Sequence, residues 1–124
     1  MGLHFRTAGI PYDEDLDFRE RAHWSYSGFH RFRERLAREI GLELDEMEGF
    51  GGTKAWDEGH PLTPLLNHSD CEGELSDAKC GLVAFGLNEI IHKWPEDDYD
   101  KIQAQKLFNH MVKCLETRRA LRFS

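Results

Sequence analysis

Three stretches of the chain place apolar residues three or four positions apart, and this helical spacing constrains the fold more than any other feature. The stretches cover about residues 25–40, 76–93 and 98–117. Shorter apolar groups at residues 44–48 and 63–67 fit single helical turns. The spacing therefore predicts a mainly α fold with three main helices, at most an α+β arrangement. A chain of 124 residues is too short for two typical domains, so we expect a single domain over residues 1–124.

Capping residues stand at the ends of these stretches. Ser25 precedes the first stretch and Gly41 follows it, as expected for an N-cap and a C-terminal glycine. Ser76 caps the second helix, and Asp97 or Asp98 caps the third. The apolar residues of the second helix spread over a wide arc, so we predict that it is the central and most buried helix.

The two ends of the chain alternate between apolar and polar residues. Leu3 and Phe5 do so near the start, and Leu121 and Phe123 near the end. This period of two is typical of strands. We predict that the ends pair as a short antiparallel ribbon.

Charge and composition narrow the classes of partner. The chain has 16 basic against 23 acidic residues, a formal charge of -7, and so repels nucleic-acid polymers and anionic membrane surfaces. No apolar run approaches the ~20 residues that cross a bilayer, and no signal segment is evident. Three cysteines without a Cys-x-x-Cys spacing predict reduced thiols. We expect a cytoplasmic protein.

Six arginines lie between residues 16 and 40, in an otherwise acidic chain. On the first helix, Arg31, Arg35 and Arg38 form a strip, whereas Arg33 lies apart from it. The strip is next to a helix start that carries Trp24. Guanidinium groups pair with carboxylate or phosphate and stack on aromatic rings, so this composition suits an anionic, ring-containing ligand. The alternative is a solvated arginine face paired with nearby acids.

The segment His68–Lys79 resembles the calcium loop of the EF-hand family, with Gly73 at the sharp-turn position. Candidate metal ligands are Asp70, Glu72, Glu74, Ser76 and Asp77. His68 and Lys79 occupy the two end positions, where oxygen ligands are expected, and this predicts weak calcium binding. The alternatives are a loop without an ion, in which Asn67 and Asp70 cap backbone groups, and a zinc site formed by His68, Cys71 and Cys80 with His60 or Asp70.

A glycine-rich turn at residues 49–52 lies between the arginine segment and this loop. It lacks the preceding strand and the following Lys-Ser/Thr of a phosphate loop, so we interpret it as a hinge that exposes Phe50 and Trp56. Three stretches, HWSYSGFHRFRERLAREIG, EMEGFGG and PLLNHSDCEGELS, resemble a family of small uncharacterised proteins of bacteria and their phages. The resemblance implies no activity, but it implies that the three stretches act in one site.

Our leading hypothesis is a non-catalytic binding protein for a small anionic molecule, phosphorylated or nucleotide-like, or for a protein partner, with homo-oligomer formation left open. The predicted ligand-binding residues are His23, Trp24, Tyr26, Arg31, Arg35, Gly51, Gly52, Trp56, Asn67 and His68. One alternative is a regulatory or structural module built on the EF-hand-like loop. Another is a small hydrolase that uses His68 and Asp70.

Overall fold

The computed structural model describes residues 2–69 and 72–124, and these form a mainly α structure with a small sheet, as predicted. The elements in chain order are β1 (Phe5–Thr7), η1 (Tyr12–Glu14), α1 (Tyr26–Glu39), η2 (Leu44–Glu46), α2 (Thr63–Leu66), β2 (Gly73–Leu75), α3 (Asp77–Ile91), α4 (Tyr99–Thr117) and β3 (Leu121–Phe123). Of the described helices, none is long and apolar enough to cross a membrane.

The predicted N-caps are confirmed. The hydroxyl of Ser25 accepts a hydrogen bond from the Gly28 amide at 3.0 Å, and that of Ser76 accepts one from the Lys79 amide at 3.3 Å. The Asp98 carboxylate caps α4 in the same way. Each cap satisfies an amide that the first helical turn leaves without an intrahelical partner.

A three-stranded antiparallel sheet joins the chain ends, in the order β1-β3-β2. Phe5 lies opposite Phe123 and Thr7 opposite Leu121, which confirms the predicted terminal ribbon. We did not predict β2, which pairs with the other edge of β3. Of its three residues only Leu75 is buried, so its sequence carries no alternating pattern to reveal a strand.

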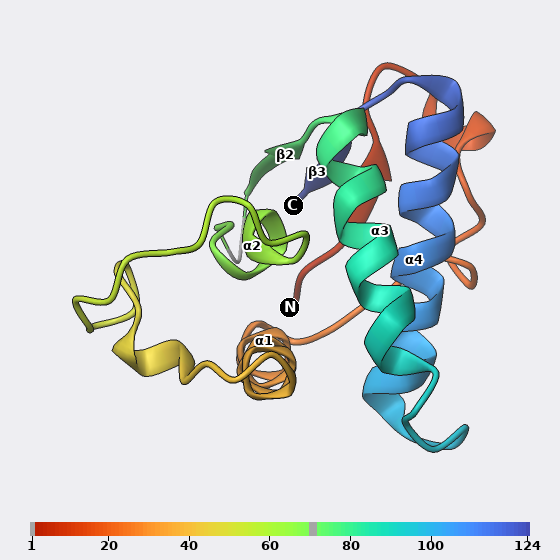
Figure 1. The fold of residues 1–124 in the computed structure, drawn as a ribbon. Helices are drawn as coiled ribbons and strands as arrows, with labels where there is room; N and C mark the ends of the chain where they lie inside the picture. Colours follow the sequence, from red (N-terminus) through yellow and green to blue (C-terminus); the bar gives the residue numbers. More distant parts are fainter. Residues whose placement is uncertain (1, 70–71) are drawn as a thin grey trace.

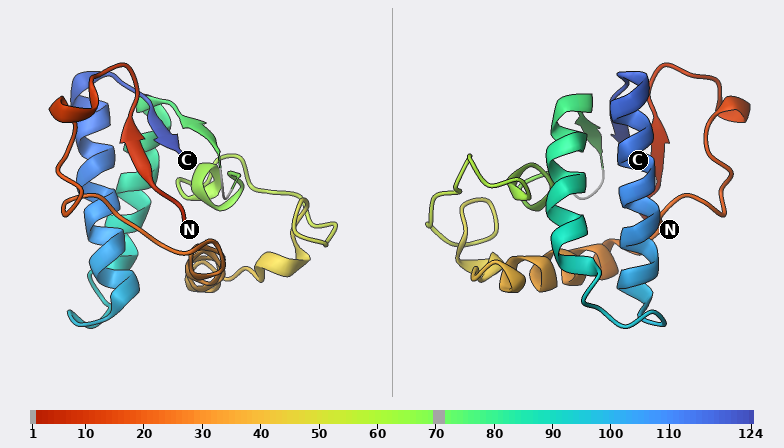
Figure 2. Two further views of the ribbon diagram at one scale, coloured as in Figure 1. Left: turned by 180° about the vertical axis from the view of Figure 1, so that it is seen from behind. Right: turned by 45° about the vertical axis from the view of Figure 1, so that its right-hand side comes forward.

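The helices α3 and α4 pack side by side as an antiparallel hairpin, and α1 runs across them, beside the lower part of the hairpin in these views (Figure 1, Figure 2). Aromatic rings fill the space between α1 and the sheet. The Trp24 ring stacks on Phe32 with centroids 4.5 Å apart, and Phe5 meets Phe123 edge to face at 5.0 Å. This core holds the start of the chain against the segment that leads into α1.

The prediction that the second helix would be the most buried of the three is confirmed by its share of buried residues, seven of 15 in α3 against five of 14 in α1 and seven of 19 in α4. On one side α3 packs against α4, and on another Gly86 contacts Leu62, next to α2. The remaining face, which carries Leu82 and Phe85, is exposed, at 53% and 61% for these two side chains.

Candidate functional site

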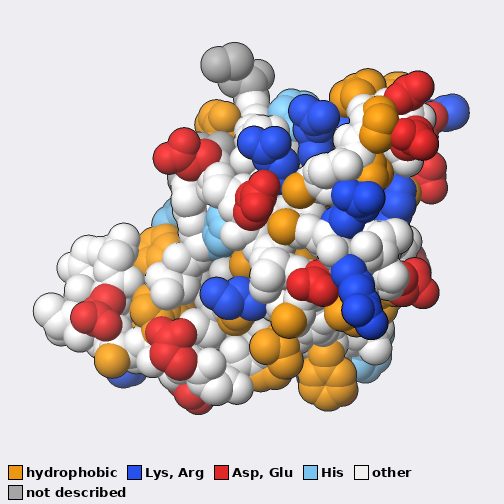
Figure 3. Space-filling model, turned by 90° about the horizontal axis from the view of Figure 1, so that it is seen from above, with side chains coloured by type: hydrophobic (Ala, Val, Ile, Leu, Met, Phe, Trp, Pro, Cys, Tyr) orange, Lys and Arg blue, Asp and Glu red, His pale blue; other side chains and the backbone are white. Residues whose placement is uncertain are grey.

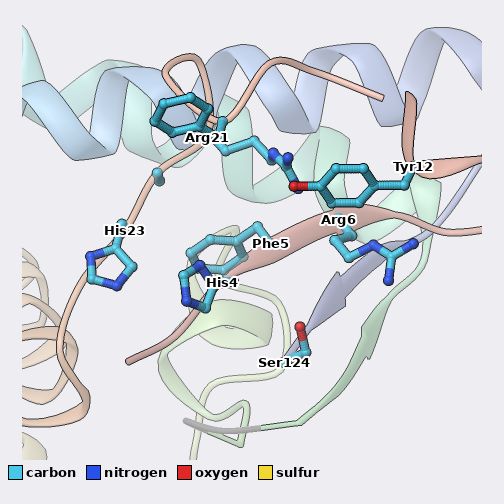
Figure 4. Close-up of a pocket in the computed structure, with 9 residues that line it drawn as sticks. His4, Phe5, Arg6, Tyr12, Arg21, His23 and Ser124 are labelled. Atoms are coloured by element: carbon cyan, nitrogen blue, oxygen red, sulfur yellow. The ribbon is translucent and has the colours of Figure 1, made fainter. Parts of the chain in front are cut away.

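A pocket of about 390 Å³ opens between β1 and the loop of residues 8–24 that follows it (Figure 4). Its lining includes four basic side chains, His4, Arg6, Arg21 and His23, and three aromatic ones, Phe5, Tyr12 and Phe18. Among the described lining residues none is acidic, although the whole chain has a formal charge of -7. The volume lies in the range of ordinary small-molecule sites.

Two guanidinium groups lie over the Tyr12 ring. The Cζ atom of Arg21 is 4.9 Å from the ring centroid, and that of Arg6 is 5.6 Å from it. The Nε–H groups of both arginines are shielded from solvent, and neither has a hydrogen-bond acceptor in the described part of the chain. Buried donors without an acceptor cost free energy, which makes this cluster unusual for a purely structural role.

Arg6 also has a like-charged neighbour in the sheet. It lies directly opposite Arg122 of β3, and a like-charged pair at such a position is destabilising. Arg122 forms an ion pair with Glu74 of β2 at 3.4 Å. Within residues 2–69 and 72–124, neither Arg6 nor Arg21 forms an ion pair with an acidic side chain. The positive charge of both therefore remains available to the pocket.

His4 and His23 form a second pair in the same pocket, with ring centroids 4.8 Å apart. Although the His23 side chain is exposed, partial desolvation at the pocket and the repulsion from His4 lower its pKa. Gly2 lets the start of the chain lie close to Trp24 and His23. A Cβ atom at position 2 would lie 2.6 Å from the Trp24 carbonyl oxygen and 2.8 Å from Nε2 of His23.

A buried polar cluster holds the loop that forms one wall of the pocket. The Asp15 carboxylate accepts hydrogen bonds from the backbone amide of Thr7 at 2.8 Å and from its hydroxyl at 2.7 Å. The Thr7 hydroxyl then accepts one from Nε2 of His110, on α4, at 2.8 Å. Lys113 lies 3.9 Å from the carboxylate. Asp15 thus connects the loop to both β1 and α4.

The His110 ring is inaccessible to solvent, and burial lowers its pKa to about 4. The ring is therefore neutral at pH 7. Hydrogen bonds from Thr7 outweigh the opposing effect of burial and keep the pKa of Asp15 below its usual value. Because the cluster is closed to solvent, we assign it a structural role and not a catalytic one.

Of the predicted ligand-binding residues, only His23 lines the Arg6–Arg21 pocket. The others are divided between different places. Trp24 and Arg31 border a second hollow of about 360 Å³, which His23 also borders, and Asn67 and His68 border a third of about 430 Å³. The structure therefore does not bring the predicted set together in one pocket.

Five predicted residues line none of these three hollows: Tyr26, Arg35, Gly51, Gly52 and Trp56. The indole of Trp56 donates to the Glu48 carbonyl at 3.0 Å. Gly52 packs so closely on the backbone of Glu46 that no side chain fits there. The contacts of the glycine turn are therefore with neighbouring residues of the chain.

Arg35 and Trp24 hold helices together. Arg35 Nη1 donates to both carboxylate oxygens of Asp98 at 2.9 Å and to Asp100 at 3.3 Å, while its guanidinium lies 3.7 Å from the Trp94 ring centroid. Trp24 is 1% exposed, and its indole N–H donates to Asp100. The hydrogen bonds with Arg35 keep the pKa of Asp98 below its usual value. These contacts tie α1 to the start of α4.

Two of the described candidate calcium ligands, Glu74 and Ser76, are engaged in other contacts. Glu74 pairs with Arg122, and the Ser76 hydroxyl caps α3. The His68 ring stacks on Phe123 at 3.9 Å. Glu72 is exposed and Asp77 lies in the first turn of α3. Asp70 and Cys71, which the calcium and zinc interpretations use, lie outside the described residues, and the rest contain no group of three or more His, Cys, Asp or Glu side chains placed to hold a metal ion.

Sequence reasoning missed the residues that the structure brings together. His4, Arg6 and Tyr12 lie in a short strand and a loop, where no helical period relates them to Arg21. The one usable signal was the arginine-rich segment, which includes Arg21. Arg33, which the helical spacing places apart from the arginine strip, is 2% exposed and donates to the carbonyls of Leu66 and His68.

The sequence matches no known protein family, and it has no significant match among curated proteins or solved structures. The geometry of the pocket is therefore the basis for a functional proposal.

Proposed function

We propose that this chain is a non-catalytic binding protein for a small anionic molecule that contains a ring, such as a phosphorylated or nucleotide-like compound, held in the Arg6–Arg21 pocket. One observation carries the proposal: two guanidinium groups lie over one tyrosine ring and form no ion pair with an acidic side chain of the described residues, in a pocket whose described lining has no acidic side chain. This ligand class is the one that the arginine segment predicted, at a different place in the molecule.

The chemistry of the lining matches such a ligand. A guanidinium group presents several N–H donors in a plane that fits phosphate or carboxylate oxygens. Phe18 is 73% exposed and Tyr12 is 62% exposed, so both offer an apolar surface on which a flat ring can stack. Binding would remove this surface from water and provide a counter-charge for Arg6 and Arg21.

Binding, and not nucleophilic catalysis, fits the lining. Tyr12 and Ser124 supply its hydroxyl groups, and in the described structure no histidine hydrogen-bonds to either one. Nucleophilic catalysis by a hydroxyl needs such a base within reach. We therefore expect the ligand to leave the protein unchanged.

The test compares Arg6→Gln and Arg21→Gln with a matched control, Arg19→Gln. Arg19 lies on the same loop but is exposed and paired with Asp17. Calorimetry with mononucleotides, cyclic nucleotides and aryl phosphates should show binding to the wild type. In each pocket variant the free energy of binding should weaken by about 1.5 to 3 kcal/mol, which is more than tenfold in affinity, because a charged hydrogen bond is lost. Arg19→Gln should bind normally.

Two results would contradict the proposal. One is that no anionic compound binds the folded wild-type protein. The other is that Arg19→Gln weakens binding as much as the two pocket variants do. Chemical analysis of the ligand after incubation checks that it is not converted.

A further inference from the structure

The four basic side chains of the pocket come from two segments that a bridge between Leu3 and Trp24 holds together. Next to this bridge, the centroids of the His4 and His23 rings lie 4.8 Å apart. Farther from it, the Cζ atoms of Arg6 and Arg21 lie 5.6 Å and 4.9 Å from the Tyr12 ring centroid. All four basic side chains therefore line the same pocket.

Resting on the proposed function, we propose that the ligand carries a terminal phosphate monoester, and that the His4–His23 pair binds this group together with Arg6 and Arg21. A monoester has three terminal oxygens and nearly two negative charges at pH 7. A diester has two free oxygens and one charge. Four basic side chains that line one pocket match the larger number of oxygens and charges of the monoester.

The environment of the histidines is predominantly positive. Arg6 and Arg21 share their pocket, and His4 repels a positive charge on His23. On its other side His23 borders the hollow that contains Arg31 and Asp100. Asp100 already interacts with Arg35 and Trp24. Partial desolvation at the pocket and the repulsion from His4 keep the pKa of His23 low, so an anion that enters should raise it and draw in a proton.

The test uses two probes that differ by one methyl group, phenyl phosphate and methyl phenyl phosphate. Calorimetry at pH 7.5 in two buffers of different ionisation enthalpy reports both affinity and proton uptake. We expect the wild type to bind the monoester at least tenfold more tightly than the diester and to take up protons with it. His4→Gln and His23→Gln should reduce the monoester affinity toward that of the diester and reduce the proton uptake. Arg6→Gln should weaken the binding of both probes.

His92→Gln is the control, because His92 is exposed on the far helix hairpin and lines a different hollow. Thermal unfolding confirms that each variant is folded, as expected since His4 and His23 are themselves exposed. Equal affinity for the two probes, or full monoester affinity in both histidine variants, would overturn this inference and leave the proposed function standing. Failure of the wild type to bind either probe or any other anion would overturn both.

Discussion

At the scale of single residues, Arg31 and Arg35 show how different two neighbours on one helix can be. They lie four positions apart, and we predicted that they would act together on a ligand. Arg31 forms no ion pair with the described acidic residues, whereas Arg35 contacts Asp98, Asp100 and the Trp94 ring. A sequence strip identifies residues on one face of a helix, but not what lies opposite each of them.

Replacing each arginine by glutamine should separate the two environments. Arg35→Gln should lower the free energy of unfolding by about 1 to 2 kcal/mol, since a partly buried bidentate pair with a stacked ring contributes more than an exposed one. Arg31→Gln should change it by less than about 0.5 kcal/mol. Urea denaturation measures both. Equal effects would show that the Asp98 and Asp100 contacts contribute nothing specific.

His110 makes stability depend on pH. Its pKa is about 4 in the folded chain and about 6.5 when unfolded, so below pH 6.5 the unfolded state binds a proton that the folded state does not. Stability from this residue is therefore present above pH 6.5 and is lost as the pH falls toward 4. Because the pKa of Asp15 is lowered, its contribution to the free energy of unfolding stays constant until the pH nears about 4.

The expected loss from His110 between pH 7 and pH 5 is about 2 kcal/mol. Denaturation at the two pH values should show this difference in wild type and in the exposed control His92→Gln. His110→Gln should be less stable at pH 7 but should lose this part of the pH dependence. An unchanged pH dependence in His110→Gln would contradict the assignment.

At the scale of elements, the segment 68–79 combines a calcium-like pattern with contacts of another kind. Glu74 faces Arg122 across the sheet, and Ser76 begins α3. Calcium would have to compete for both side chains, with His68 and Lys79 at the ends of the loop. The residue types of a calcium loop are therefore present in the sequence. In the structure, however, Glu74 helps to pair β2 with β3, and Ser76 caps the start of α3.

Calcium should therefore bind no more tightly than millimolar. Calorimetric titration of calcium into the metal-free protein measures this directly. The variant Lys79→Glu, which restores an acidic residue at the last loop position, serves as a comparison and should bind more tightly if the loop register is right. A micromolar dissociation constant for the wild type would instead favour a genuine EF-hand-like site.

The loop of residues 8–24 is the element that makes the candidate site. It contains only one helical turn, η1, yet it positions Tyr12 and Arg21. Its rigidity comes from Asp15, which is bonded to Thr7, and from Arg119, which donates to the Gly9 carbonyl at 2.9 Å. A loop fixed at both places can present a preformed pocket and lose less entropy on binding.

At the scale of the whole molecule, the sheet joins β1, near the start of the chain, to β3, near its end (Figure 1). His4 and Ser124, from these two segments, line the pocket. Lys and Arg side chains gather over the face above the C-terminal end of α4, interspersed with acidic ones (Figure 3). Although the total charge is -7, the distribution leaves a local basic wall. An acidic protein can thus still attract a small anion.

The sequence by itself determined the helices, their caps and the terminal ribbon, because these depend on periodicity and on residues close together in the chain. Ser25, Ser76 and Asp98 act within one turn of their own positions. The composition of the arginine-rich segment also predicts an anionic ligand, and this stays a prediction. The periodicity, the caps and the composition are local properties.

Only the tertiary structure decided the place of the candidate site. Arg6 and Arg21 both lie over the Tyr12 ring because a bridge and an aromatic core bring the start of the chain beside the segment before α1. Arg35 instead pairs with Asp98 and Asp100 at the start of α4. Pairings between residues far apart in the chain depend on packing and register, which no local pattern encodes.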